Sequence, residues 1–382
     1  MAGKRSIFED VDAGETTRPS RETGVIDRSA KSTGRRAIRG WLILLFAMVF
    51  AMILIGGLTR LTDSGLSITE WNVIKGAIPP LSAADWALAF EKYQTIPEFQ
   101  LQNSEMTLAE FKGIYWWEWG HRQFGRLMGL VWAIGFVYFL ARRQVPAGWV
   151  PRLLILGLLG GLQGAVGWWM VHSGLSGEML DVASYRLAAH LGMAFAILGI
   201  ITWSILQLSR PERDLMQARR SRERKLFGLG TGVMHLAFVQ ILLGALVAGI
   251  DAGRNYHDWP LMAGSFTPPG MWDIEPVWRN LFENDGTVQF IHRMVAYLLF
   301  AFGIFVWSRG RRSAFKLTRR AFNWMAVLLL GQVVMGIVTV MHFSPWYLAI
   351  AHQGMAVLLW VFIIRARFLA GYPRAGTLRE GL

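Results

Sequence analysis

The chain has no cysteine and comparatively few charged residues. Without cysteine, disulfides, thiolate metal sites, thioether-linked heme and cysteine nucleophiles are excluded, and histidine is the only strong nitrogen ligand that remains. Charged residues make up 17% of the chain, whereas about a quarter is usual for soluble globular proteins. Hydrophobic residues reach 53% and the mean hydropathy is +0.34. This composition excludes an ordinary soluble protein and indicates a large surface that faces lipid.

Eight apolar runs predict transmembrane helices. Each is about 20 residues long, which is enough for a helix to cross a hydrocarbon core of about 30 Å. The runs are 41–58, 120–140, 153–171, 185–207, 227–250, 288–308, 321–341 and 347–366. The sequence therefore predicts an all-α integral membrane protein with eight transmembrane helices.

The basic residues are distributed unevenly between the two sides of this topology. In a soluble protein, a net charge of +13 would suggest nucleic-acid binding. Here 29 of the 39 Lys and Arg residues fall in 1–40, 141–152, 208–226, 309–320 and the segment after 364. By the positive-inside rule, both termini are predicted to be cytoplasmic. The basic charge then needs no nucleic-acid partner.

Segments outside the spans have three expected roles. Residues 1–40 carry nine basic residues and no apolar run, so they are predicted to form a disordered cytoplasmic tail and not a cleaved signal peptide. Two long loops, 59–117 and 251–287, are rich in tryptophan and are predicted to pack over the outer membrane surface. Residues 208–226 form a basic linker, and 367–382 a second cytoplasmic tail.

A four-helix unit occurs twice in the chain. The segment from Gly57 through Asp63 is echoed by the segment from Gly244 through Asp251, and later motifs containing histidine are echoed in the same order. Four spans per unit give both copies the same orientation, so the repeat is parallel, with its axis along the membrane normal. We therefore predict two pseudo-symmetric four-helix bundles, 41–207 and 227–366, each with its own interior site.

Four of the eight histidines share one depth. His121, His190, His292 and His352 lie in the first turns of the second, fourth, sixth and eighth predicted helices, within roughly 10 Å of the outer boundary. A single histidine in a membrane is commonly a packing or helix-end residue, but ionisable groups there are costly unless they are used. Two imidazoles from facing helices can bind one heme from both sides. Zinc is disfavoured because two histidines per site leave the third or fourth ligand missing, and only the first site has a nearby carboxylate.

The other histidines are weaker candidates. His172 and His342 end the third and seventh helices, where extension to the interface or a propionate contact explains them equally well. His235 has no counterpart in the first half when Gly57 is matched with Gly244, and it is interpreted as a packing or regulatory residue. His257 lies in a loop and is assigned a surface role.

A glutamate distinguishes the two halves. Glu118 precedes His121 by three residues and so shares its helix face, whereas Gln289 stands at the matching position before His292. This difference indicates one site for chemistry and one site that only holds a cofactor. The alternative is that Glu118 is a solvated residue at a helix N-terminus.

Arginines on the outer side are predicted to pair with heme propionates or with loop acids. They are Arg122, Arg126, Arg186 and Arg293, with Arg60 as a further propionate candidate just beyond the first span.

Together, these features resemble heme A synthase. The resemblance rests on the duplicated halves, the stretch Gly56 to Ser67 (GGLTRLTDSGLS), Glu118-x-x-His121 and the three later histidines, and it covers 41–366. It implies conversion of heme O to heme A, the prosthetic group of cytochrome c oxidase. It also implies that His121 and His190 hold the substrate heme O, that Glu118 is the catalytic carboxylate, and that His292 and His352 ligate heme b. Some members carry a cysteine pair in an external loop, and this chain does not.

The chemistry of the residues fits this activity. Oxidation of a methyl group on a porphyrin leaves an electron-poor carbon, and a nearby carboxylate can stabilise that carbon or deprotonate water. The resemblance implies heme O supplied by heme O synthase, a separate electron acceptor, a role in cytochrome c oxidase assembly and a homo-oligomer. Two alternatives are a quinol-linked di-heme cytochrome b and a transporter or heme chaperone. The enzyme alone would make heme A.

Overall fold

The computed structural model describes residues 30–177 and 179–374, with side chains from Gly34 onward, and in that part of the chain it contains only helices. Eight of them are long and apolar enough to span a membrane. These are α1 (Ala30–Leu61), α4 (Leu108–Ala141), α5 (Val150–Val171), α6 (Ser184–Leu208), α8 (Arg224–Gly249), α10 (Asp285–Gly310), α11 (Lys316–Met341) and α12 (Trp346–Gly371). They coincide with the eight predicted runs, so the predicted all-α membrane architecture is confirmed.

Several helices extend beyond the apolar runs. α1 begins at Ala30, so residues 30–40 are helical and the prediction of disorder was wrong for them. α12 continues to Gly371, five residues into the predicted C-terminal tail. An apolar run measures only the hydrocarbon core of about 30 Å, whereas the headgroup regions widen the membrane to about 40–45 Å. Residues 1–29 and 375–382 of the predicted tails lie outside the described residues.

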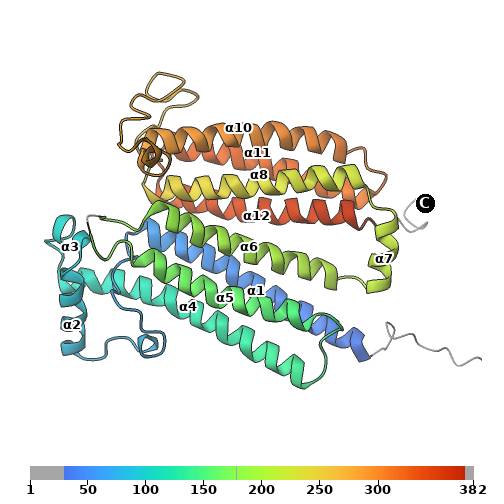
Figure 1. Ribbon diagram of the computed structural model, residues 1–382, viewed down its shortest axis with the longest axis horizontal. Coiled ribbons are helices and arrows are strands. Elements are labelled where there is room, and N and C mark those ends of the chain that lie inside the picture. Colours follow the sequence, from blue (N-terminus) through green and yellow to red (C-terminus); the bar gives the residue numbers. More distant parts are fainter. Residues whose placement is uncertain (1–29, 178, 375–382) are drawn as a thin grey trace, which may run out of the picture.

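The spanning helices pack in two groups of four. α1, α4, α5 and α6 contact one another in a closed ring, and so do α8, α10, α11 and α12. Figure 1 shows the two groups side by side, with α6 and α1 next to α12 and α8. The repeat that relates the predicted halves 41–207 and 227–366 stays a prediction from the sequence.

The two groups meet through α6, α8, α12 and α1. The indole of Trp360 on α12 donates a hydrogen bond to the main-chain oxygen of Phe195 on α6, at 3.0 Å. Gln353 on α12 donates to the main-chain oxygen of Ile53 on α1, at 2.9 Å. One apolar core continues through both groups. The groups are therefore in direct contact, which fixes the separation between sites inside them.

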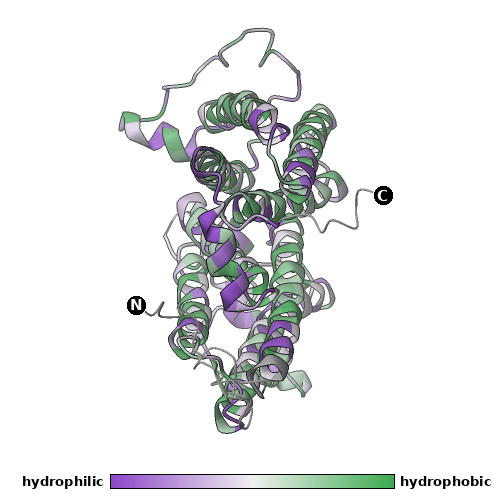
Figure 2. Ribbon diagram, turned by 90° about the vertical axis from the view of Figure 1, so that its right-hand side faces the viewer, coloured by the Kyte–Doolittle hydropathy of each residue, from purple (hydrophilic) through white to green (hydrophobic). Residues whose placement is uncertain are grey.

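The two ends of the helix assembly differ in structure. The polar helix α7 (Glu212–Arg220) lies at the end where α1 begins and α12 ends (Figures 1 and 2). The opposite end carries α2 (Ala83–Gln94), α3 (Pro97–Leu101), α9 (Asn280–Glu283) and the 3-10 turns η1 (Lys75–Ala77) and η2 (Val277–Arg279). Basic linker and long loops thus lie at opposite ends, as the charge distribution predicts.

The long loop 59–117 is folded. Ser82 and Thr107 begin α2 and α4 with capping boxes, which satisfy the first free N–H groups of each helix. Aromatic side chains of α2, α3 and the outer turns of α4 then form a small separate core that includes Trp86, Tyr93 and Phe111. This core holds the loop against the outer end of α4, where Glu118 and His121 follow.

Candidate functional site

The four predicted ligand histidines lie on α4, α6, α10 and α12, one on each. All four are partly buried. His121 and His190 belong to helices of one group of four, and His292 and His352 to helices of the other. His121 lies about four turns into α4 and not in the first turns as predicted, because the Thr107 capping box starts α4 outside the apolar run. The structure therefore places one predicted pair of histidines in each group.

Each of these rings lies against a glycine of a neighbouring helix. A Cβ atom at Gly56, Gly167, Gly244 or Gly336 would lie 3.3, 2.8, 3.2 or 3.0 Å from the nearest ring atom of His121, His190, His292 or His352, respectively. Glycine at these four positions removes the one atom that would push the ring aside. The fourfold recurrence indicates that each ring has a built seat in the adjacent helix.

Three of the rings also have a glutamine partner that the sequence reasoning missed. Gln163, Gln240 and Gln332 stand four residues before the seat glycine, and their amide nitrogens lie within 3.4 Å of both ring nitrogens. Each amide also donates to the main-chain oxygen of the same histidine at 3.0–3.2 Å. The repeated spacing Gln-x-x-x-Gly was the available signal.

His121 has no such partner. Met52 stands four residues before Gly56, and its terminal methyl group reaches toward Gly125, one turn along α4 from His121. The seats also correct the register of the repeat, because Gly56 and not Gly57 plays the part of Gly244. In this register His235 corresponds to Ala47, which is again not a histidine.

Glu118 is buried and fully hydrogen-bonded. Only 2% of the residue is exposed, so it is not the solvated helix-end residue of the alternative interpretation. One carboxylate oxygen accepts from the Ser67 hydroxyl at 2.7 Å and from the Ile68 amide at 2.8 Å. The other accepts from Nε and Nη2 of Arg122 at 3.0 and 2.6 Å. Four donors therefore fix the carboxylate next to His121.

Gln289, at the matching position of α10, is also buried. Its amide donates to the main-chain oxygen of Ala252 at 2.5 Å, and its own oxygen has no hydrogen-bond partner within the described ranges. Glu118 and Gln289 thus each contact the segment that follows the first helix of their half, but only Glu118 brings a negative charge.

The predicted propionate arginines all have protein partners. Arg122 and Arg293 each donate to main-chain oxygens of the loop above their site, those of Ile68 and Glu70 or of Tyr256, Asp258 and Leu261. Arg60 lies within 2.8–3.4 Å of carboxylate oxygens of Asp63, Asp181 and Asp251. Since Asp251 belongs to the second half, Arg60 joins the two halves at the outer end.

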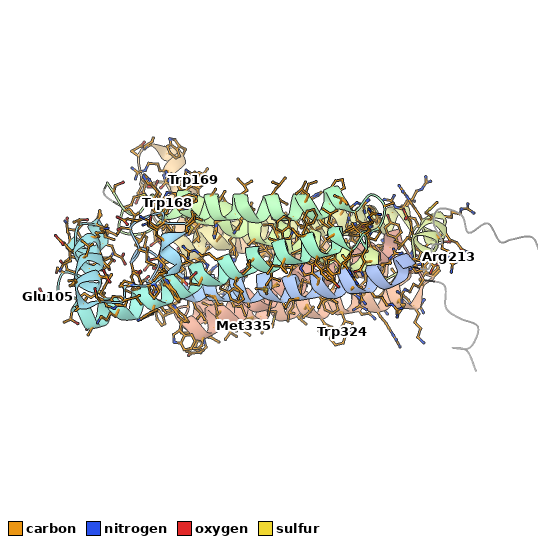
Figure 3. The ribbon with its side chains drawn as sticks, turned by 90° about the horizontal axis from the view of Figure 1, so that it is seen from below. Glu105, Trp168, Trp169, Arg213, Trp324 and Met335 are labelled. Carbon is orange, nitrogen blue, oxygen red and sulfur yellow. The ribbon has the colours of Figure 1, made fainter. Side chains whose placement is uncertain are left out.

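Trp168 on α5 lies next to Arg122, the ion-pair partner of Glu118. The guanidinium of Arg122 lies 5.8 Å from the ring centre of Trp168, and Trp168 follows Gly167, the seat of His190. Figure 3 shows Trp168 and Trp169 at the end that carries α2 and α3, and Arg213 at the other end. Glu118 and Arg122 therefore lie at the outer rim of the His121/His190 site.

A second buried acid, Glu98, lies in the outer loop. It is 4% exposed, and its Oε2 has no hydrogen-bond partner among the described residues. Burial, together with the nearby negative charges of Asp181 and Asp63, raises the pKa of Glu98 to about 8. Glu98 is therefore mostly protonated at neutral pH, in contrast to an ion-paired carboxylate. No motif or spacing in the sequence points to this residue.

The remaining histidines are exposed and lie apart from the paired rings. His172 and His342 end α5 and α11, His235 lies on the outside of α8, and His257 stacks on Phe343 with ring centres 4.2 Å apart. The predicted rank order of the histidines is thus consistent with their places in the fold.

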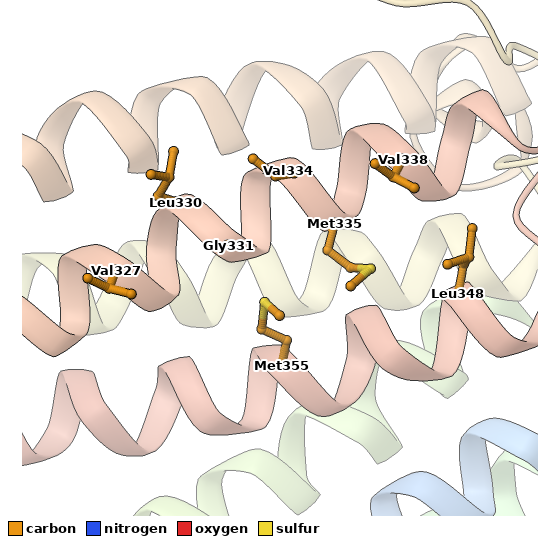
Figure 4. A pocket seen from close by; sticks show the side chains of 8 residues that line it. All are labelled: Val327, Leu330, Gly331, Val334, Met335, Val338, Leu348 and Met355. Atoms are coloured by element: carbon orange, nitrogen blue, oxygen red, sulfur yellow. The ribbon is translucent and has the colours of Figure 1, made fainter.

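A shallow apolar groove runs between α11 and α12, past Gly331 and Met355 (Figure 4). It is lined by aliphatic side chains and by Met335 and Met355, and the sulfur of Met355 lies near Gly331. The groove adds no titratable group to the site.

Fold and site together define a multi-pass helical membrane protein with two pairs of histidines inside the membrane, one pair in each group of four helices. The chain belongs to the cytochrome oxidase assembly protein family, whose match covers residues 39–364.

Relatives named heme A synthase are similar over almost the whole chain. The protein of Dinoroseobacter shibae is 63% identical over 379 residues, which covers 99% of both chains. That of Ruegeria pomeroyi is 62% identical over 381 residues, covering 99% of this chain and 100% of the relative. That of Paracoccus denitrificans is 60% identical over 378 residues and covers 98% of both. The family resemblance found in the sequence is confirmed.

Proposed function

We propose that this protein converts heme O to heme A by oxidising a methyl group of the porphyrin to a formyl group, for the assembly of cytochrome c oxidase. Relatives named heme A synthase are similar to this chain over nearly the full length of both proteins. The observation in the structure that supports the proposal most directly is Glu118, a buried carboxylate beside one histidine pair, where the other pair has Gln289.

The residues of both sites fit heme. Four glycine seats leave room for the imidazole rings, and three buried glutamine oxygens beside those rings lack a hydrogen-bond donor. In our proposal His121 and His190, in the bundle 41–207, hold the substrate heme O. His292 and His352, in the bundle 227–366, ligate heme b. When bound, heme b would supply one-electron transfer.

Glu118 is the proposed catalytic carboxylate. Its oxygens are held by Ser67, Ile68 and Arg122, so its position is set before substrate binds. A negative charge held in place stabilises the positive charge that develops at the methyl carbon as electrons are withdrawn, or accepts a proton from water. Arg122 orients this carboxylate through two hydrogen bonds, and Gln289 cannot take this role because an amide carries no charge.

Further parts of the proposal concern the surroundings of the sites. Arg60, Arg122 and Arg293 contact heme propionates, which join or replace their present partners. The protein lies in the bacterial inner membrane with both termini in the cytoplasm, in line with the basic end that carries α7. Heme O comes from heme O synthase, electrons leave to a separate acceptor, and the protein forms a homo-oligomer.

Pigment analysis tests this function. The protein is produced in a host that makes heme O but no heme A, and the extracted pigments are identified by mass. We expect heme b together with heme O and heme A in the wild type, and heme b with heme O only in Glu118→Gln. Glu105→Gln changes an exposed acid at the same end and is the control, which should still form heme A. A pigment that contains heme b alone, with no heme A under any condition, would support the electron-carrying cytochrome instead.

A further inference from the structure

We propose that Gln163, Gln240 and Gln332 are positioning residues that anchor three of the four heme-ligating imidazoles, and that Met52 leaves His121 as the one unanchored ligand, through which the substrate heme is exchanged. This inference rests on the proposed function, because it takes the four histidines to be heme ligands.

The three glutamines share one geometry on three different helices. Each stands one turn before a seat glycine, on α5, α8 or α11, and so faces the same ring as that glycine. The ring is thus held between the amide and the glycine of one neighbouring helix. Chance packing does not explain why the same pair of residue types recurs at the same spacing beside three separate histidines.

Each glutamine has an unused acceptor. The amide oxygens of Gln163, Gln240 and Gln332 are buried and have no hydrogen-bond partner in the part of the chain that the structure describes, which is costly for a polar atom. A histidine that binds iron through Nε2 carries its proton on Nδ1, and this N–H normally donates to an acceptor outside the metal site. The glutamine oxygen is the available acceptor.

This hydrogen bond requires the glutamine side chain to move. The amide nitrogen lies 3.2, 3.0 and 3.2 Å from Nδ1 of His190, His292 and His352, and 3.4, 3.2 and 3.2 Å from Nε2 of the same rings, so it lies beside each ring and not along the Nδ1–H bond. A shift of the side chain toward Nδ1 brings the glutamine oxygen into line with Nδ1–H and breaks the present bond of the amide to the main-chain oxygen. The histidine main-chain oxygen, which lies inside a helix, keeps its helical N–H partner.

His121 differs in the same structural terms. Met52 occupies the position of the three glutamines relative to Gly56, and a thioether is at best a weak acceptor. Among the described residues, no side chain is hydrogen-bonded to the His121 ring. The ring therefore has a seat but no anchor, and its bond to iron has no outside support for its orientation or its basicity.

This asymmetry matches what the two sites must do. Heme b stays in place, and both of its proposed ligands, His292 and His352, have an anchor. The substrate heme must enter and leave, and of its two proposed ligands only His190 has one. Outer hydrogen-bond partners of metal ligands contribute about 10- to 100-fold to metal affinity. We infer that exchange begins with the release of His121.

The first experiment measures the heme b midpoint potential in the purified, heme-loaded protein. Gln240→Met introduces the residue type of Met52, which stands at the matching position of the first site. It should raise the midpoint potential, because His292 loses an acceptor and becomes less basic. Gln240→Glu keeps an acceptor, adds charge and should lower it. Shifts of the midpoint potential in opposite directions at one position distinguish this hydrogen-bonding role from a role in packing alone. Gln353→Met, which removes a buried amide bonded to α1 and not to a ring, should leave the midpoint unchanged.

The second experiment measures transfer of heme O from the loaded protein to excess apomyoglobin. Gln163→Met should speed transfer by about 10- to 100-fold, and Met52→Gln, which supplies the missing amide, should slow it by at least about tenfold. Met52→Leu is the control and should match the wild type.

The outcomes separate this inference from the proposed function. If His292→Ala keeps its low-spin heme spectrum, heme ligation itself is wrong. A second outcome is that the spectra confirm two histidine ligands per heme, but the variants have no effect. If the midpoint potential is unchanged in Gln240→Met and Gln240→Glu, and the transfer rate is unchanged in Gln163→Met and Met52→Gln, the anchoring role is refuted while the enzyme function stands.

Discussion

Replacing Glu118 by glutamine tests the site at its best-defined contact. The side chains of Glu118 and Arg122 are 3% and 20% exposed, and their closest oxygen and nitrogen are 2.6 Å apart. Breaking a buried ion pair by removing one partner typically costs about 3–5 kcal/mol, because the other charge is left uncompensated. The Ser67 and Ile68 donors can still bond the amide oxygen of glutamine, so we expect a loss near the lower limit, about 3 kcal/mol.

A double-mutant cycle isolates the ion pair from these other effects. In Glu118→Gln/Arg122→Gln no charge is left unpaired, so the double variant should lose less unfolding free energy than the sum of the single variants, by about 2 kcal/mol. Unfolding is followed by helical circular dichroism in mixed micelles at increasing denaturing detergent. Heme A formation should be lost in Glu118→Gln and should stay lost in the more stable double variant. Strictly additive free energies, or a double variant that regains heme A synthesis, would refute this reasoning.

Two further predictions concern the seats and the second buried acid. Gly167→Ala puts a methyl group 2.8 Å from His190 and should lower heme content in the first site, whereas Gly164→Ala on the same helix meets nothing within 4 Å and should keep it; pigment extraction compares the two. Glu98 is harder to ionise in the folded protein, where its pKa is about 8, than in the unfolded chain. Its stabilising effect is therefore complete below about pH 4.5 and is lost as pH rises to about 8, at 1.36 kcal/mol per unit. Glu98→Gln should remove this pH dependence, and identical unfolding curves for variant and wild type from pH 5 to 9 would contradict it.

The features that the sequence predicted well are those encoded within one helix. Each span is marked by its own apolar run, and Glu118 and His121 share a face because helical spacing requires it. Helix ends were predicted less well, since Thr107 starts α4 by a local cap that hydropathy does not measure. The burial of Glu118 could not be predicted, because it depends on the folded loop that covers the outer end of α4.

Contacts between distant segments could not be predicted in the same way. Ser67 reaches Glu118 across 51 residues of sequence, and Arg60 meets Asp251 across 191, so neither pair has a local signature. Gln163 and Gln332 stand in segments whose similarity is visible in the sequence. Their role emerged only from the recurrence of the same geometry at Gln240, on a helix that occupies a different place in its bundle.

The most direct test of the account is the pigment of the purified protein with each paired histidine changed in turn. We predict a wild-type protein with two hemes, each with a low-spin spectrum, and loss of heme b alone in His292→Ala or His352→Ala. His121→Ala or His190→Ala should change only the heme O and heme A fraction. A colourless wild-type protein, or four variants with unchanged absorption and pigment composition, would contradict the account.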